Sequence, residues 1–410
     1  MGEIFTPLFL AANTIVIFYL VFPFLNTAAG FFIREKKPKT DGDAETDFGI
    51  IITSYKDIEI TRPLILSVLK QKYSAYHIYL VADHCEENSG FISDSKLTVI
   101  YPEPYLNSKV KSILLGADSF IREHDYTLIF DPDNLASPGL LNGFNSYCRA
   151  GFKAVQGRRA AKNLDSHYAC LDALGEHYYN HTQRYVPFVL GSSAPIAGSG
   201  MVIETSLYKQ ILNEIESENE EGKVIVAEDK MLQNKIVERG LRIAYAKDAV
   251  VYDEKIDTGQ QLERQRTRWL NSYFKHFTES VKLMLAGIFT LDWNRFYFGL
   301  IVSTPPMVVM LLAGVVFFLS DMFISVPYFI ATVAAGLLFS SNFILILFAV
   351  KAEKEIWSAL LGLPAFILNQ MLALFRIRKA NTDFMVTTKS KVMSIEDVIS
   401  QREKDDDGKN

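Results

Sequence analysis

The chain has 410 residues, a formal net charge of -5, 49% hydrophobic residues and 22% charged residues. This composition is close to that of an average soluble protein and excludes a disordered chain, a collagen-like chain and a small disulfide scaffold. The length allows two or three domains, and the mild acidity without a basic stripe gives no reason to expect a nucleic-acid partner. Cys85, Cys148 and Cys170 show no C-x-x-C spacing, so neither a disulfide framework nor a structural zinc site is expected.

The hydrophobic residues are concentrated in segments that contain no Asp, Glu, Lys or Arg. These segments are 4–33, 296–320, 322–350 and 356–375. Each is about as long as the roughly 20 apolar residues that cross a bilayer. We therefore expect a transmembrane anchor over residues 1–33 and a membrane region over residues 296–380. A cleaved signal peptide is the alternative for the first segment, which lacks the basic leader of such peptides.

Basic runs beside these segments predict the orientation. The run at 34–39 follows the anchor, and cationic flanks remain in the cytoplasm. We therefore expect an integral protein of the bacterial inner membrane, in contact with membrane lipids, with a cytoplasmic central domain. A second basic run at 376–379 follows the last segment. Segment 356–375 is either a third C-terminal span that violates the charge rule or, as we favour, an interfacial or re-entrant helix.

The region between the membrane segments predicts alternating strands and helices. Apolar runs of strand length occur at 48–53, 77–82, 96–101, 126–130, 152–156 and 201–204. Helical spacing of apolar residues occurs at 58–71, 107–123, 138–150, 165–185 and from residue 228 onward. This alternation predicts an α/β fold with a mostly parallel sheet, which binds ligands at the carboxyl ends of its strands. The acidic stretch 216–221 and the tail after Ser400 are expected to be solvated.

Acidic residues follow three of the predicted strands. Asp57 follows the first, Asp83 the second, and Asp131 with Asp133 the fourth. Each residue alone could be a turn former. Acidic residues after three strands of one sheet are harder to explain as turn formers than a single such residue would be. They favour a ligand site at this edge of the sheet.

Asp131 and Asp133 are separated by one proline at the end of an apolar strand. Alternate residues of an extended chain point the same way, so both carboxylates can approach one hard divalent cation, with phosphate oxygens completing its coordination. The alternative is a turn cap. The position directly after a buried strand favours the metal interpretation.

Glu228 and Asp229 stand at the start of a predicted helix. One interpretation is that they complement the helix dipole. The other is that one carboxylate is a general base, which removes a proton from an attacking hydroxyl.

Gln265, Arg268 and Trp269 lie in a predicted helix just before the membrane region. Their spacing of i, i+3 and i+4 places them on one face. A guanidinium suits a diphosphate leaving group, and an indole ring suits stacking on a sugar. The alternative is an Arg and a Trp that rest at the lipid headgroups.

Together these residues resemble membrane-bound family 2 glycosyltransferases, the group that includes cellulose, chitin and hyaluronan synthases and ceramide glucosyltransferase. The resemblance covers about residues 48–269 and rests on an ordered set of motifs. In chain order they are Asp83, Asp131-x-Asp133, Glu228-Asp229 and Gln265-x-x-Arg268-Trp269. Four motifs in one order are far more specific than any one of them.

The resemblance implies an α/β domain of the GT-A fold that binds a UDP-sugar through Mg²⁺ or Mn²⁺. By this resemblance, Asp57 and Asp83 lie near the uridine and Lys109 near the nucleotide or diphosphate. Asp131 and Asp133 hold the metal and the diphosphate. Asp229 is the catalytic base, with Glu228 beside it.

The acceptor side of the site is implied in the same way. Gln265, Arg268 and Trp269 would line the diphosphate and acceptor site, and the loop Gly198-Ser199-Gly200 lets a sugar approach the backbone. Four residues resemble the gating loop of cellulose synthases, which covers the UDP: Phe384, Val386, Thr387 and Lys389. This loop must then lie on the cytoplasmic side.

These observations lead to one expected organisation. The expected parts are an anchor (1–33), a catalytic GT-A domain (34–270), an interfacial helix (271–295), a membrane region (296–380) and a cytoplasmic tail (381–410). The expected function is an inverting transfer of a hexose or N-acetylhexosamine from a UDP-sugar to a growing β-glycan. Two alternatives are a single transfer to a membrane lipid and a non-catalytic scaffold in an export or assembly complex.

Overall fold

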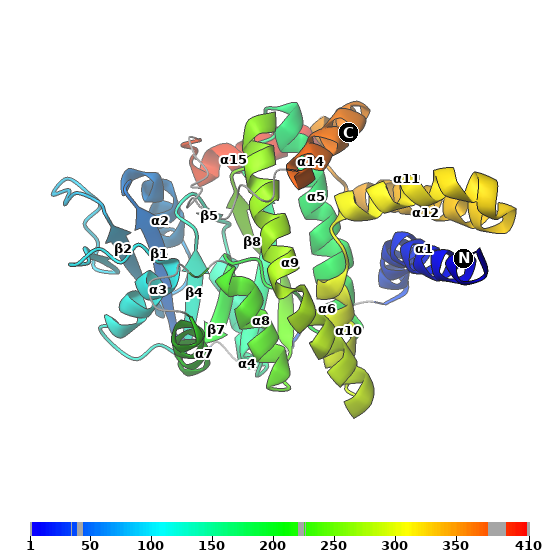
Figure 1. Ribbon diagram of the computed structural model, residues 1–410. Coiled ribbons are helices and arrows are strands. Elements are labelled where there is room, and N and C mark those ends of the chain that lie inside the picture. Colours follow the sequence, from blue (N-terminus) through cyan, green and yellow to red (C-terminus); the bar gives the residue numbers. More distant parts are fainter. Residues whose placement is uncertain are drawn as a thin grey trace.

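A mixed sheet forms the centre of the protein, and a computed structural model describes residues 2–33, 35–38, 44–219, 225, 227–375 and 391–407. Its strand order is β3-β2-β1-β4-β7-β6-β8-β5 (Figure 1). The strands are β1 Phe48–Tyr55, β2 Tyr76–Asp83, β3 Leu97–Ile100, β4 Tyr126–Phe130, β5 Leu135–Ala136, β6 Ala154–Ala161, β7 Met201–Glu204 and β8 Ile243–Asp253. Only the pairs that involve β7 or β5 are antiparallel among the described strands, so the predicted α/β fold with a mostly parallel sheet is confirmed.

Helices cover both faces of the sheet, which explains why its strands are almost continuously apolar. On one face lie α2 (Arg62–Leu69) and α4 (Leu140–Arg149), which share a core with Ile50 and Ile52 of β1. On the other face lie α3 (Lys109–Asp118), α7 (Thr205–Glu218) and α8 (Glu228–Glu238), which share a core with Ile51. Successive residues of β1 therefore point into different layers.

The remaining helices do not belong to these two layers. They are α1 (Gly2–Phe32), α5 (His167–Tyr178), a π-helical turn (Tyr179–Tyr185), α6 (Val186–Val189), α9 (Gly259–Thr290), α10 (Trp293–Ser303), α11 (Met307–Ile324), α12 (Val326–Val350), α13 (Lys354–Ala359), α14 (Leu363–Phe375) and α15 (Ile395–Asp407). α9 begins at a capping box, in which Thr258 and Gln261 satisfy each other's backbone N–H groups.

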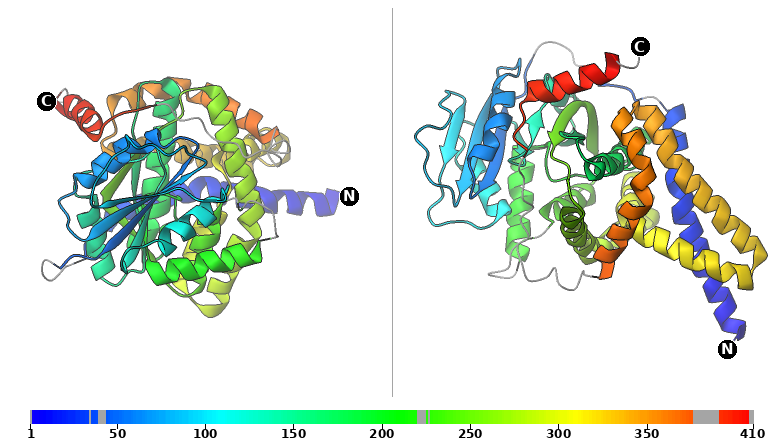
Figure 2. Two further views of the ribbon diagram at one scale, coloured as in Figure 1. Left: turned by 90° about the vertical axis from the view of Figure 1, so that its left-hand side faces the viewer. Right: turned by 90° about the horizontal axis from the view of Figure 1, so that it is seen from above.

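Among the residues that the structure describes, three helices are long and apolar enough to cross a membrane: Thr6–Phe32 of α1, α11 and α12. They extend together to one side of the sheet domain, away from β1 to β3 (Figure 2). Within this group Asn13 and Thr332 donate hydrogen bonds to Oδ2 of the buried Asp321 at 2.7 Å and 3.0 Å. These contacts join α1, α11 and α12.

Residues 296–320 were predicted to form one continuous membrane segment, and this prediction is wrong. These residues divide between α10 and α11, with the break at Thr304-Pro305-Pro306, because proline has no N–H to continue the helix. Segment 356–375 forms α13, a short turn and α14. The described residues of α14 number 13, a length of about 20 Å, which is shorter than the roughly 30 Å hydrocarbon core of a bilayer.

The two charged segments that were expected to be solvated are helical in part. α7 continues through the acidic residues to Glu218. The C-terminal tail is helical from Ile395 to Asp407, and Ile395 and Val398 pack against Leu135 and Tyr252 of the sheet. These two apolar side chains precede the charged tail and dock it. The proposed gating loop at 384–389 lies outside the described residues.

Candidate active site

The carboxyl ends of the parallel strands lie along one edge of the sheet. Tyr55, the last residue of β1, pairs with Asp83, the last residue of β2. β4 is parallel to β1, and β6 and β8 run in the same direction because β7 is antiparallel to both β4 and β6. Residues after β4, late in β6 and at the end of β8 therefore share this edge.

Lys109 brings four of the predicted site residues together. Its Nζ donates to Oδ1 of Asp131 at 2.9 Å and to the carbonyl oxygen of Gly198 at 3.1 Å, and it lies 3.4 Å from Oε1 of Glu228. Burial lowers the pKa of this ammonium, but the charges of Asp131 and Glu228 outweigh burial and raise the pKa above its usual value. Lys109 is therefore charged, and its cation joins acidic residues from two loops.

Glu228 and Asp229 begin α8, directly after Ala227, which has a φ of 65°. Burial raises the pKa of Glu228 above that of a free glutamate, Lys109 opposes this effect, and the charge of Asp229 adds to it. Oδ2 of Asp229 would lie only 3.5 Å from a Cβ atom built on Gly198. The two carboxylates therefore differ in their surroundings: Glu228 faces Lys109, and Asp229 faces the glycine loop.

The loop Gly198-Ser199-Gly200 is held tightly between β4 and β6. Gly200 donates its N–H to the carbonyl oxygen of Ile129 at 2.8 Å, and its own carbonyl accepts from Gly157 at 2.8 Å. Gln156 donates to the carbonyl oxygens of Ser199 and Gly200, both at 3.1 Å. All three residues of the loop are buried, and Gly198, which has no side chain, is the one that lies beside Asp229.

Asp131 and Asp133 lie at the sheet edge as predicted, but in different surroundings. The Asp131 carboxylate is partly exposed beside Lys109, whereas Asp133 is buried. The backbone N–H of Asp131 is fixed by Oδ1 of Asn134 at 3.1 Å. Within the described ranges no group of three or more His, Cys, Asp or Glu residues has the arrangement of a metal site.

Asp83 and Asp57 both accept hydrogen bonds from the backbone. The buried Asp83 accepts from the N–H groups of Leu106 and Asn107, at 2.9 Å and 2.7 Å. Asp57 accepts from the N–H of Glu59 at 3.0 Å. The carboxylate of Asp83 thus fixes the turn that leads into α3, and thereby the position of Lys109.

The motif Gln265-Arg266-Thr267-Arg268-Trp269 lies in the first half of α9. Arg268 and Trp269 are exposed, with 37% of Trp269 accessible, and Gln265 is partly buried beside them. The sequence argument missed Arg266, which is buried. Its Nη2 contacts Oδ1 of Asp172 at 2.6 Å, and its guanidinium carbon lies 4.3 Å from the centre of the Trp269 ring.

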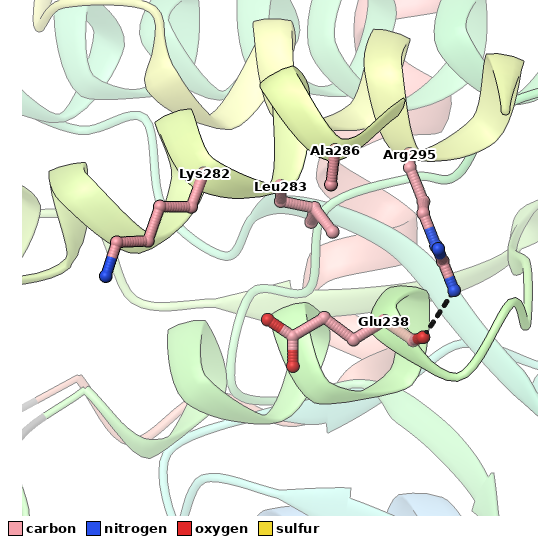
Figure 3. Close-up of a pocket in the computed structure, with 5 residues that line it drawn as sticks. All are labelled: Glu238, Lys282, Leu283, Ala286 and Arg295. Atoms are coloured by element: carbon pink, nitrogen blue, oxygen red, sulfur yellow. Dashed lines mark hydrogen bonds between the residues drawn. The ribbon is translucent and has the colours of Figure 1, made fainter. Parts of the chain in front are cut away.

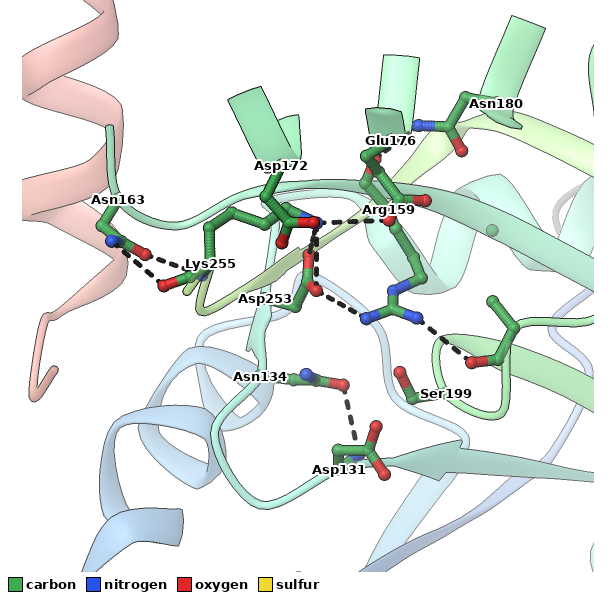
Figure 4. A network of polar contacts seen from close by, with 12 residues as sticks. Asp131, Asn134, Arg159, Asn163, Asp172, Glu176, Asn180, Ser199, Asp253 and Lys255 are labelled. Atoms are coloured by element: carbon green, nitrogen blue, oxygen red, sulfur yellow. Dashed lines mark hydrogen bonds and ion pairs between the residues drawn. The ribbon is translucent and has the colours of Figure 1, made fainter. Parts of the chain in front are cut away.

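A buried network of charges next to Asp131 was also missed (Figure 4). Arg159 of β6 contacts Asp253 of β8 at 2.5 Å and donates to the carbonyl oxygen of Ala197 at 3.1 Å. Lys255 contacts Asp253 at 3.0 Å and Glu176 of α5 at 3.2 Å. The sequence signal for this network was the presence of charged residues late in β6 and at the end of β8. Because β8 was not predicted, Asp253 and Lys255 could not be placed at this edge of the sheet.

A pocket of about 210 Å³ lies elsewhere, between α8, α9 and α10 (Figure 3). It is lined by Glu238, Lys282, Leu283, Ala286 and Arg295. Arg295 donates to the carbonyl oxygen of Glu238 at 2.7 Å. None of the predicted site residues lines this pocket, so it is separate from the acidic edge.

One of three comparisons with known proteins identifies the family of the chain. No curated protein sequence matches the chain. Among solved structures, the chain is similar to a mannosyltransferase from Pyrobaculum calidifontis in complex with GDP-Man and Mn²⁺, with 14% sequence identity, a TM-score of 0.47, and coverage of 86% of this chain and 98% of that chain. The model of the "Glycosyltransferase like family 2" matches residues 46–272, more than half of the chain. The chain therefore belongs to this family of glycosyltransferases.

Proposed function

We propose that the protein is an inverting glycosyltransferase that moves a hexose or N-acetylhexosamine from a UDP-sugar to the end of a growing β-glycan. The observation that carries this proposal is the meeting of Asp131, Glu228 and the Gly198 loop at Lys109, with Asp229 beside the same loop. It combines an ammonium group that can contact a diphosphate with a carboxylate beside a glycine that has no side chain. Both are needed to transfer a sugar from a nucleotide to a hydroxyl.

Asp229 is the base in this proposal. Its carboxylate lies next to Gly198, where the missing side chain leaves room for an acceptor. Asp229 takes the proton of the acceptor hydroxyl while the oxygen attacks the anomeric carbon of the donor. The bond from that carbon to the diphosphate breaks, and UDP leaves with the electron pair. A single displacement inverts the configuration, so an α-linked donor gives a β-glycoside.

The leaving diphosphate is received by cations. Lys109 stands at the sheet edge, and the exposed guanidinium of Arg268, with Gln265 one turn earlier, is assigned to the same phosphates. The acidic residues fit a divalent cation because carboxylates from two loops, Asp131 and Glu228, already converge on the ammonium of Lys109. Asp131 and Asp133 would hold Mg²⁺ or Mn²⁺, which when bound neutralises charge on the diphosphate.

Transfer of one sugar to a membrane lipid is the second candidate. Exposed apolar residues continue along α9 beyond Trp269 toward α10: Phe274, Phe277, Leu285, Ile288 and Phe289. An apolar tail could lie along this helix with its headgroup at Trp269. In both candidates α1, α11 and α12 span the bacterial inner membrane, and the catalytic domain is cytoplasmic. Membrane lipids, and any export or assembly partner, would contact the helices outside the sheet domain.

The experiment is a donor screen with the purified protein in detergent. Labelled UDP-glucose, UDP-N-acetylglucosamine and GDP-mannose are supplied with octyl β-glucoside as acceptor, and the length of the product is analysed. We expect turnover of a UDP-sugar that EDTA stops and Mg²⁺ or Mn²⁺ restores. A product with one added sugar replaces the polymer proposal with lipid transfer, and turnover of GDP-mannose alone contradicts the UDP assignment. Activity indifferent to EDTA contradicts the metal assignment of Asp131 and Asp133.

A further inference from the structure

Helix α5 carries two buried carboxylates that the proposed mechanism does not use. Asp172 and Glu176 lie one turn apart, and their side chains are 7% and 10% exposed. Each binds cations from other elements of the fold.

The first carboxylate controls the Trp269 end of the site. Asp172 contacts Arg266 of α9 at 2.6 Å, although the two residues are 94 positions apart in the chain. The guanidinium of Arg266 lies over the Trp269 ring, 4.3 Å from its centre, so it covers one face of the indole. Asp172 thus fixes the guanidinium, and the guanidinium fixes the ring.

The second carboxylate controls the glycine-loop end of the site. Glu176 contacts Lys255 at 3.2 Å, and Lys255 contacts Asp253 at 3.0 Å. Asp253 in turn contacts Arg159, which donates to the carbonyl oxygen of Ala197, the residue before Gly198. The same chain of contacts is visible in Figure 4.

Helix α5 itself is well anchored. Its first turn is capped by the Ser166 hydroxyl, which accepts from the N–H of Ala169 at 3.0 Å. Glu176 is held a second time by Arg184, at 2.7 Å. Leu171 and Leu174 are buried in a core shared with α13 and α14. One rigid helix therefore holds both the aromatic ring and the glycine loop.

We propose that Asp172 is a positioning residue, which acts through Arg266 to hold the Trp269 ring as a plate for the acceptor sugar. The opposite, uncovered face of the indole receives a pyranose ring. The distance between this plate and the Gly198 loop, where Asp229 stands, is set by α5 through Asp172 and Glu176. This inference rests on the proposed function, since it needs an acceptor sugar.

The kinetic test compares Asp172→Asn with the unmodified protein. The donor is the UDP-sugar found in the screen, and the acceptor probe is octyl β-glucoside. We expect the KM for octyl β-glucoside to rise at least about tenfold, with the KM for the donor and its slow hydrolysis unchanged within twofold. Arg266→Lys keeps the charge but loses the planar stack and should behave similarly. Arg264→Lys, on an exposed face of the same helix, is the matched control and should change nothing.

The spectroscopic test needs no enzymatic activity. Trp269, Trp293 and Trp357 are the three tryptophans of the chain, so Trp293→Phe and Trp357→Phe leave Trp269 as the only one. In this background Asp172→Asn should increase the quenching of fluorescence by acrylamide, and Asp172→Glu should restore part of the protection. Arg264→Lys should again change nothing.

The outcomes separate this inference from the proposed function. If the unmodified protein turns over no nucleotide sugar, the proposed function fails, and the inference, which depends on it, fails as well. If it is active but Asp172→Asn leaves both the acceptor KM and the quenching unchanged, the inference alone is overturned. A lower thermal stability of Asp172→Asn with an unchanged acceptor KM also overturns it, because Asp172 would then only join α5 to α9.

Discussion

Gly198 and Gly139 offer a matched pair of substitutions that isolates the role of the glycine loop. Both have a φ of 77°, a conformation that costs a residue with a side chain about 1–2 kcal/mol. Alanine at either position should therefore lower the free energy of unfolding by about the same amount. The surroundings differ, because a Cβ on Gly139 meets nothing within 4 Å, whereas a Cβ on Gly198 meets Oδ2 of Asp229 at 3.5 Å.

In the proposed mechanism, the added methyl of Gly198→Ala stands where the acceptor hydroxyl approaches Asp229. A general base needs its partner within about 2.6–3.2 Å and contributes about 10²–10⁴-fold to the rate. We therefore expect kcat for sugar transfer to octyl β-glucoside to fall at least about 100-fold in Gly198→Ala and less than about twofold in Gly139→Ala. The assay is UDP release with each variant, beside urea unfolding to confirm equal stability. Equal activity of the two variants would refute the placement of the acceptor at Gly198.

Two further predictions concern stability. The Lys255 side chain is 3% exposed between two carboxylates, so Lys255→Met should lower the free energy of unfolding by about 3–5 kcal/mol. The control is Lys153→Met, which removes a 45% exposed ion-pair partner of Glu204 and should lower the free energy of unfolding by less than about 1 kcal/mol. Similar losses for the two variants in urea unfolding would contradict the argument that burial makes Lys255 important. Burial opposes ionisation of Glu353, but His177 and Arg402 outweigh it and hold its pKa at about 2, below the 4.5 of a free glutamate. The ionised Glu353 therefore stabilises the fold by about 3 kcal/mol at neutral pH, and this stabilisation is lost as pH falls from about 4.5 toward 2. Glu353→Gln should lower the free energy of unfolding at pH 7 but not near pH 2. A loss of stability that does not depend on pH would disprove this prediction.

The central strands could be predicted because their apolar runs are uninterrupted. β4 and β7 begin and end at the predicted residues. β8 was missed because Lys247 and Asp248 interrupt its apolar run, and both are exposed where β6 and β8 lose register. β5 has only two residues, too few to form a pattern.

The site residues could be predicted only as far as local patterns allow. Strand exits and motif order singled out Asp131, Glu228 and the Gly198 loop, which contact one another through Lys109. Helical spacing grouped Gln265 with Arg268 and Trp269, but it could not show that Arg266 points inward, because the buried face of a helix depends on what packs against it. The contact between Arg266 and Asp172 joins residues 94 positions apart, and a single sequence holds no signal for such a pair.

The central claim is that Asp229 is the base that activates the acceptor. The most direct measurement is sugar transfer by Asp229→Asn, with nucleotide binding measured in parallel by calorimetry with UDP and Mn²⁺. Glu238→Gln, an exposed acid at the other end of α8, is the control. We predict that Asp229→Asn loses at least about 100-fold in kcat while it binds UDP as tightly as the unmodified protein and the control. Full transfer activity in Asp229→Asn would contradict the account.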